Sequence, residues 1–522
     1  MADDTETTTK ESSSKKRGWG FRIVALALGL LPFFLFEGVL MLGGWGTPDP
    51  SDDPFVGFAS KRPLFALNEE GSHFTIAPSR RDWFYPAQFT AEKSKDTFRI
   101  FCIGASTVAG RPYTVETAFS SWLRLFLEQS DPSRKWEVVN CGGVSYASYR
   151  LVPIVEEVLA NYAPDLIILY TGHNEFLEDR TYEHIKGLPL AVTKPYELAS
   201  HLRTFNLMRS AYLRVSGQTS PSIMEARAIM PEEVDALLEH KGGMENYFRD
   251  DEWQQGVIDH YRFNLDRMCA QSRKANVPMI VMNPCSNLRD THPFKSERRS
   301  DLTEKEREEA EELLEKAIES LAETEIERAE ILYQAALDID PLHAETHYRF
   351  GKLRDLTNDF APAYDSYVKA KDLDVCPLRM LEPMHEVLKE VVARHGVELI
   401  DTRAEVEKII IPTGIPSNEE FLDHVHPNIG GHQFFAKLLA EKMEAMGFVT
   451  LPRPPADDNE PEDSASPRWL RSMGAALHEY VNTLPAGYFA EGNMRLENLR
   501  HWARGHSEIE PPVESKRRKP AN

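Results

Sequence analysis

Five short apolar runs, separated by longer helical patterns, constrain the fold of this chain more than any other feature. Continuous apolar runs of this length are typical of strands that are buried on both faces of a sheet. They lie at residues 99–103, 137–139, 166–170, 278–282 and 397–400. Because helical patterns alternate with these runs, the sequence predicts an α/β fold in which helices cover both faces of one parallel sheet.

Three polar motifs stand directly after an apolar run or before a helical pattern. They are GAST at residues 104–107, GHNE at residues 172–175 and DHVH at residues 423–426. Ligands bind at the carboxyl ends of the strands in open parallel sheets, and the first two motifs fall at such ends. We therefore expect these distant segments to meet in one site.

The residue types in these motifs are those of a serine nucleophile and its base. Ser106 stands at a strand-to-helix turn, where N–H groups can hold an oxyanion, although helix capping is a competing role. Asn174 can aim a side-chain amide at the same point, or it can serve as a turn residue. The spacing of Asp423 and His426 lets the carboxylate fix the imidazole tautomer. His424 is the competing histidine, but its adjacency to Asp423 makes the same geometry awkward.

In motif type and order, the chain resembles the SGNH, or GDSL-type, hydrolase superfamily over residues 95–300 and 380–450. The resemblance implies a flavodoxin-like three-layer fold. It also implies an esterase or acyltransferase that acts on acyl esters and needs no metal or cofactor. The catalytic residues that it implies are Ser106, Gly143, Asn174, Asp423 and His426.

Two departures from the pattern of this superfamily matter. The first motif reads GAST instead of GDS, so Ala105 replaces the usual acidic residue. The second block reads NCGGVSYAS at residues 140–148, and the register of its usual glycine is ambiguous. Either Gly143 or the backbone of Ser145 could supply the second oxyanion donor, and we take Gly143.

A helical insertion is expected between the fourth and fifth strands, at residues 302–378. Residues 302–321 have helical spacing, and a 34-residue repeat follows them. Its first copy has Ala329, Tyr333, Ala336 and Asp340, and its second has Ala363, Tyr367, Ala370 and Asp374. The period and the Ala/aromatic spacing resemble tetratricopeptide repeats, which implies a protein partner. The alternative is an ordinary helical hairpin packed on the core.

The N-terminal region carries the pattern of a membrane anchor. Residues 1–22 are polar and basic, and residues 23–45 are apolar except for Glu37, which is about the length that a membrane span requires. Basic residues precede the span and none follows directly, which predicts a cytoplasmic tail and a catalytic domain outside the cytoplasm, in the periplasm. A cleaved signal peptide is the competing interpretation, but the small-residue cleavage pattern is missing.

Composition narrows the function further. A net charge of −22 argues against nucleic acid as a partner, which requires basic surface. The five cysteines have no metal-ligand spacing and are expected to be buried thiols. The remaining segments are an N-terminal extension at residues 46–97, hydrolase parts at residues 98–301 and 379–450, and a linker with a helical C-terminal segment at residues 451–522.

The sequence therefore predicts a membrane-anchored serine hydrolase or acyltransferase acting on acyl esters outside the cytoplasm. The alternative is a scaffold protein in which the helical insertion binds a partner and the hydrolase core is vestigial.

Overall fold

The computed structural model describes residues 12–43, 45–46, 56–58, 62–178, 202–205, 207–208, 211, 228–230, 233–239, 243–453 and 467–506. The chain divides into two compact units. One consists of Met1–Gly57 and Arg180–Met230, and the other of Phe58–Asp179 and Pro231–Asn522. All three polar motifs belong to the second unit.

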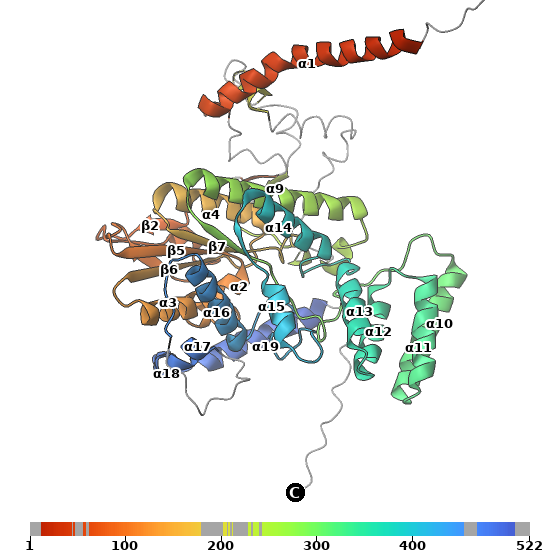
Figure 1. Ribbon diagram of the computed structural model, residues 1–522. Helices are drawn as coiled ribbons and strands as arrows, with labels where there is room; N and C mark the ends of the chain where they lie inside the picture. The colour runs from red at the N-terminus through yellow and green to blue at the C-terminus, as the bar shows by residue number, and fades with distance from the viewer. Residues whose placement is uncertain are drawn as a thin grey trace, which may run out of the picture. The chain divides into compact units, whose positions relative to one another are not determined.

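A five-stranded parallel sheet forms the centre of the second unit (Figure 1). Its spatial order is β10-β9-β7-β5-β6, so the first strand of the sheet lies between the second and the third. This is the flavodoxin-like order, in which ligands bind where the strand order reverses. All five predicted strands are confirmed, as β5 (Thr97–Gly104), β6 (Lys135–Gly142), β7 (Leu166–Tyr170), β9 (Met279–Met282) and β10 (Glu398–Ile400).

Helices cover both faces of the sheet and complete three layers (Figure 1). One face carries α3 (Phe119–Ser130) and α16 (Ile429–Ala445), and the other carries α4 (Ser148–Asn161), α9 (Asp251–Ala275) and α14 (Glu382–His395). Every residue of β7 and β9 is buried, which is why these strands read as continuous apolar runs. The prediction of an α/β fold with helices on both faces of one parallel sheet is thus confirmed.

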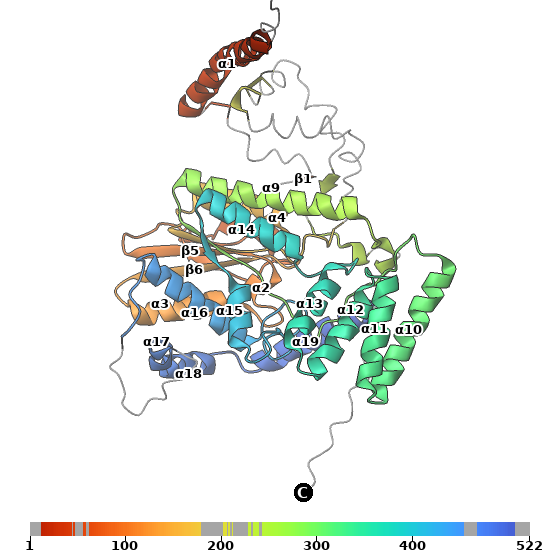
Figure 2. The same cartoon turned by 45° about the vertical axis from the view of Figure 1, so that its right-hand side comes forward.

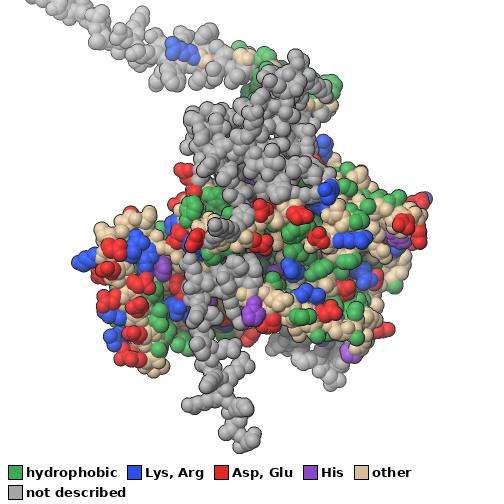
Figure 3. All heavy atoms as spheres, turned by 180° about the vertical axis from the view of Figure 1, so that it is seen from behind, with side chains coloured by type: hydrophobic (Ala, Val, Ile, Leu, Met, Phe, Trp, Pro, Cys, Tyr) green, Lys and Arg blue, Asp and Glu red, His purple; other side chains and the backbone are tan. Residues whose placement is uncertain are grey.

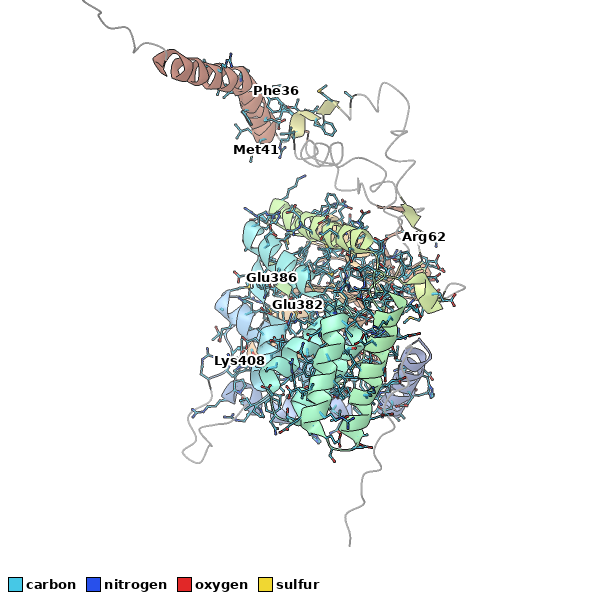
Figure 4. The ribbon with its side chains drawn as sticks, turned by 90° about the vertical axis from the view of Figure 1, so that its right-hand side faces the viewer. Phe36, Met41, Arg62, Glu382, Glu386 and Lys408 are labelled. Atoms are coloured by element: carbon cyan, nitrogen blue, oxygen red, sulfur yellow. The ribbon has the colours of Figure 1, made fainter. Side chains whose placement is uncertain are left out.

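The insertion consists of two helical hairpins, α10 (Glu304–Ala322) with α11 (Ile326–Ile339) and α12 (Ala344–Leu356) with α13 (Phe360–Asp372). Figure 4 faces these helices and labels Glu382 and Glu386 on the neighbouring α14. The repeated Ala, Tyr and Asp positions are all buried, at Ala329, Tyr333, Ala336, Asp340, Ala363, Tyr367, Ala370 and Asp374. The all-α insertion is confirmed, and its assignment to the tetratricopeptide class stays a prediction.

The segments that flank the hydrolase core contain elements that we did not predict. Residues 62–97 include a small antiparallel sheet of β2 (Phe65–Leu67), β3 (His73–Ile76) and β4 (Gln88–Thr90). The C-terminal segment, expected only as helical, forms α17 (Arg468–Ser472), α18 (Gly474–Asn482) and α19 (Tyr488–His506). Tyr480 on α18 and Tyr488 on α19 hydrogen-bond to the chain between Thr114 and Thr117.

The first unit contains α1 (Ser12–Gly43) and a two-stranded sheet of β1 (Val56–Phe58) and β8 (Ala228–Met230). Glu37 on α1 accepts hydrogen bonds from the backbone N–H groups of Arg203 and Thr204, at 2.9 and 2.7 Å. Among the helices in the described part of the chain, we find none that is both long and apolar enough to span a membrane. The transmembrane prediction for residues 23–45 is thus not confirmed.

Candidate active site

Ser106 is the first residue of the short helix α2 (Ser106–Ala109), directly beyond the end of β5. Ala105 occupies the cap position and makes no side-chain capping bond, so Ser106 does not act as the helix cap. Gly104 lets the ends of β5 and β7 lie close together, since a Cβ at this position would lie 2.2 Å from the carbonyl oxygen of Tyr170. The serine hydroxyl is thereby placed at the carboxyl end of the sheet.

The hydroxyl of Ser106 lies 2.8 Å from Nε2 of His426, and Nδ1 of the same ring lies 2.6 Å from Oδ2 of Asp423. The structure thus brings Ser106 together with a pair of residues that follows it by about 320 positions in the sequence. An ionised carboxylate only accepts hydrogen bonds, so Nδ1 carries the proton and Nε2 is left to accept from the serine. All three side chains are more than nine-tenths buried.

Backbone hydrogen bonds within the DHVH loop hold Asp423 in place beside His426. The second oxygen of Asp423 accepts hydrogen bonds from the N–H groups of Val425 and His426, at 2.9 and 2.8 Å. Burial alone would raise the pKa of Asp423. The neighbouring imidazoles of His426 and His424, with the hydrogen bond from His426 and that from Val425 N–H, outweigh burial and hold the pKa well below its usual value. Asp423 is therefore a fixed negative charge at neutral pH.

His424, the competing histidine, lies differently. Its Nδ1 is 3.7 Å from Asp423, beyond hydrogen-bonding range, and its ring packs edge-on against Phe294. Burial, together with the charge of nearby His426 and Arg379, lowers the pKa of His424 to about 4 despite the opposing effect of Asp423. His426, not His424, makes the contact with Ser106.

Asn174 and Gly143, the two predicted oxyanion donors, have other partners in this structure. The amide nitrogen of Asn174 donates to the carbonyl of Tyr146 at 3.2 Å, which places this side chain against the loop after β6. The N–H of Gly143 donates to the carbonyl of Gly104 at 2.9 Å. The choice of Gly143 therefore meets a physical objection, because its N–H already bridges the ends of β5 and β6.

Ser145, the alternative to Gly143, has a different backbone environment. It adopts the left-handed region, with φ 64°. Val144 N–H donates to Trp83 and Tyr146 N–H donates to Gly143. Within the described residues, the N–H of Ser145 has no such partner.

The other two polar residues of the GHNE motif serve the fold. Glu175 accepts hydrogen bonds from the N–H and the hydroxyl of Ser148, each at 2.8 Å, and so caps the start of α4. His173 accepts from the N–H of Met380 at 3.2 Å. Burial, then the charges of His424, His426 and Lys371, lower the pKa of His173 to about 3, so it stays neutral at ordinary pH.

The support behind the DHVH loop comes from Asn287, which the sequence offered as a residue that could face the site or form a turn, and from Arg379, which it did not indicate. Asn287 donates its N–H to the carbonyl of His424 at 3.0 Å, and its side chain donates to Asn418 at 2.8 Å. Arg379 in turn donates to the carbonyl of Asn287 at 2.9 Å. The only signal in the sequence was the position of Asn287 shortly after the fourth strand.

No group of three or more His, Cys, Asp or Glu side chains in the described ranges is arranged to hold a metal ion. The five cysteines are all free and buried, as expected.

Comparisons with known proteins give distant similarities in fold only. No protein-family model matches this chain, and no curated protein matches it. Among solved structures, an acetylxylan esterase (Axe2) of Geobacillus stearothermophilus is 14% identical, with a TM-score of 0.29, over 68% of this chain and 96% of the esterase. A lipase/acylhydrolase of Enterococcus faecalis is 12% identical, with a TM-score of 0.29, over 68% of this chain and all of the other. Overlaps this loose say nothing about activity or substrate.

Proposed function

We propose that this chain is a serine esterase or acyltransferase that works through an acyl-enzyme on Ser106. The observation that carries the proposal is the continuous hydrogen-bond chain from Ser106 through His426 to Asp423. The alignment of a buried serine with a buried histidine that hydrogen-bonds to an aspartate favours this proposal over the vestigial-scaffold alternative.

The first half-reaction follows from this geometry. Nε2 of His426 takes the proton of Ser106 as Oγ bonds to the ester carbonyl carbon, and Asp423 stabilises the imidazolium that forms. The tetrahedral intermediate collapses when the ester C–O bond breaks, and His426 gives its proton to the departing alcohol. Water or a second alcohol then attacks the acyl-enzyme with His426 again as base, which yields hydrolysis or transfer.

The developing oxyanion needs donors beside Ser106. Ser106 occupies the first position of α2, where backbone N–H groups have no intrahelical partner. We assign the second backbone donor to Ser145, because its N–H has no partner among the described residues while that of Gly143 is engaged. Asn174 supplies the third donor by exchanging its bond to Tyr146 for one to the substrate.

The nucleophile is tested by Ser106→Ala. This variant should lose turnover of every ester that the wild type cleaves, and it should no longer react with a fluorophosphonate probe, while circular dichroism stays that of the wild type. Full activity of the folded variant would refute the proposal.

We further propose that residues 23–45 anchor the chain in a membrane, with the hydrolase core outside the cytoplasm. The length of the apolar run and the basic residues before it support this proposal. A reporter enzyme that is active only outside the cytoplasm, fused after Asn522, should be active. A signal from a cytoplasm-only reporter at the same position would contradict the proposed topology.

A further inference from the structure

A groove lies between α11 and α12, away from the active site. Its volume is about 550 Å³, and α11 contributes most of its lining. Glu327, Glu330, Ile331 and Asp338 stand on this face of α11, and Phe350 and Arg354 close the groove from α12. Positions three and four apart share one face of a helix, so these side chains form one stripe.

The groove combines negative charge with an exposed apolar side chain. Ile331 is 69% exposed although it stands in the middle of the stripe. Glu327 and Glu330 form no ion pair with any residue in the described ranges. Within the described residues Arg354 forms no ion pair with them, because its guanidinium stacks on Phe350 and donates to Ser366 in its own hairpin. Its single positive charge leaves the groove net negative. In Figure 3, carboxylates and basic side chains both lie over the outer edge of the insertion.

The chain itself contains a segment of complementary chemistry. Residues 516–519 read KRRK, the densest basic run in a chain of net charge −22, and Val513 precedes them as an apolar side chain. These residues follow α19 and lie outside the described residues. Residues 513–519 also contain Glu514, so the segment carries four positive charges, one negative charge and one apolar side chain. The groove carries three carboxylates, the guanidinium of Arg354 and one exposed isoleucine, and the net charges of the two remain opposite.

Contacts through the loop that contains Leu422 and Asn418 connect α19 with α12. Arg500 on α19 donates to the carbonyl of Leu422, and in the same loop the N–H of Asn418 donates to Asp290. Asp290 also accepts from Lys352 on α12 at 3.0 Å. In Figures 1 and 2, α19 runs from α18 towards the insertion. About ten residues separate the end of α19 from Lys516, and an extended chain of that length spans about 33 Å.

We propose that the groove between α11 and α12 binds the basic segment at residues 513–519 of the same chain. The lysines and arginines pair with Glu327, Glu330 and Asp338, and Val513 covers Ile331. Charge pairs at an exposed surface are individually weak, so the cluster of several pairs and the covered apolar side chain act together. The contact weakens as ionic strength rises.

The test places a photo-crosslinker on the segment in the full-length chain. Because the five native cysteines are buried, Ala521→Cys provides one accessible thiol for a benzophenone maleimide. After illumination, digestion and mass spectrometry should locate the crosslinks on α11 and α12. Mixing isotope-labelled with unlabelled protein should give crosslinks within single chains only.

A matched pair of variants separates the groove from charge in general. Glu327→Gln/Glu330→Gln/Asp338→Asn should lower the crosslink yield at least about fivefold, as three ion pairs disappear. Glu308→Gln/Glu309→Gln/Glu315→Gln removes the same charge from exposed positions of α10 and should leave the yield unchanged. Equal losses in both variants, crosslinks away from α11 and α12, or crosslinks between two copies would each overturn the proposal.

Discussion

Asp423 in the DHVH loop and Asp374 just after α13 both have buried side chains, and both accept backbone hydrogen bonds, yet their pKa values move in opposite directions. Asp374 accepts from the N–H groups of Phe294, Lys295 and Cys376. Burial nevertheless raises the pKa of Asp374 to about 7, against the opposing effect of Arg379 and these hydrogen bonds. Asp423 has fewer backbone donors, and its pKa is lowered.

The partners of the two carboxylates explain this difference. Asp423 holds an imidazole at 2.6 Å, a group that becomes charged during the proposed reaction. Arg379 directs its hydrogen bonds to the carbonyls of Asn287 and Thr291. Burial thus determines the protonation of Asp374, whereas a directly bonded imidazole determines that of Asp423. Asp423 is therefore suited to support the proposed base His426. Asp374, which accepts from Phe294 and Lys295, is suited to join the insertion to the core.

The largest expected effect comes from breaking the imidazole–carboxylate pair. Asp423→Asn should leave His426 in the wrong tautomer, and a comparable change in a serine protease costs about 10⁴ in kcat. His426→Ala should be at least as damaging, because the proton of Ser106 then has no acceptor. The measurement is kcat on any ester that the wild type cleaves.

His424→Ala is the control for this pair, since it removes an adjacent imidazole without touching Ser106. It should lower kcat by less than about tenfold, because its ring only packs beside the site. An inactive His424→Ala with an active His426→Ala would reverse the choice of base. Activity in both variants would remove the Asp-x-x-His assignment.

A second effect should appear in stability rather than in rate. A carboxyl group with a raised pKa in the folded state stabilises the fold below the unfolded pKa of about 4, and this stabilisation is lost as the pH rises through about 7. Asp374 should therefore make the wild type less stable by a few kcal/mol between pH 4 and pH 7. For Asp423 the sign reverses, because its pKa is lowered and its contribution disappears only as the pH falls below about 4.

Urea unfolding across this pH range checks the comparison. In Asp374→Asn the titrating group is gone, so its unfolding free energy should stay constant in this range. The unfolding free energy of the wild type minus that of the variant should therefore fall as the pH rises from 4 to 7. The corresponding difference for Asp423→Asn should instead shrink as the pH falls below 4. A difference for Asp374→Asn that stays constant from pH 4 to pH 8 would show that this carboxyl does not titrate as proposed.

The five strands and the three polar motifs could be predicted from the sequence because each leaves a local pattern in it. The five strands are buried on both faces, so their apolar runs are continuous, and Ser106, Asp423 and His426 belong to motifs whose chemistry fixes their spacing. The sequence offered Asn287 only by its position after the fourth strand and did not indicate Arg379, because their hydrogen bonds go to carbonyls that only the folded chain brings near. The small sheet of residues 62–97 was missed because its strands are three or four residues long.

Gly143 illustrates the same limit at a single position. A glycine beside the second strand was a reasonable oxyanion donor by residue type, but the hydrogen bond from its N–H to Gly104 depends on the register of β5 and β6. The left-handed backbone of Ser145 is equally invisible in the sequence, since serine is not enriched in that region.

The smallest expected effect concerns this backbone position. A non-glycine residue in the left-handed region costs about 1 kcal/mol, whereas glycine adopts it readily. Ser145→Gly should therefore raise the unfolding free energy by up to about 1 kcal/mol, part of which the greater freedom of glycine in the unfolded chain offsets. If Ser145 contributes only its N–H to the oxyanion, kcat of Ser145→Gly should stay within about twofold of the wild type.

Ser145→Ala serves as the control, because it removes the hydroxyl and keeps the strained backbone. It should change neither the unfolding free energy nor kcat. A large loss of kcat in both variants would show that the Ser145 hydroxyl acts in the reaction, and the assignment of the backbone donor would then have to be withdrawn.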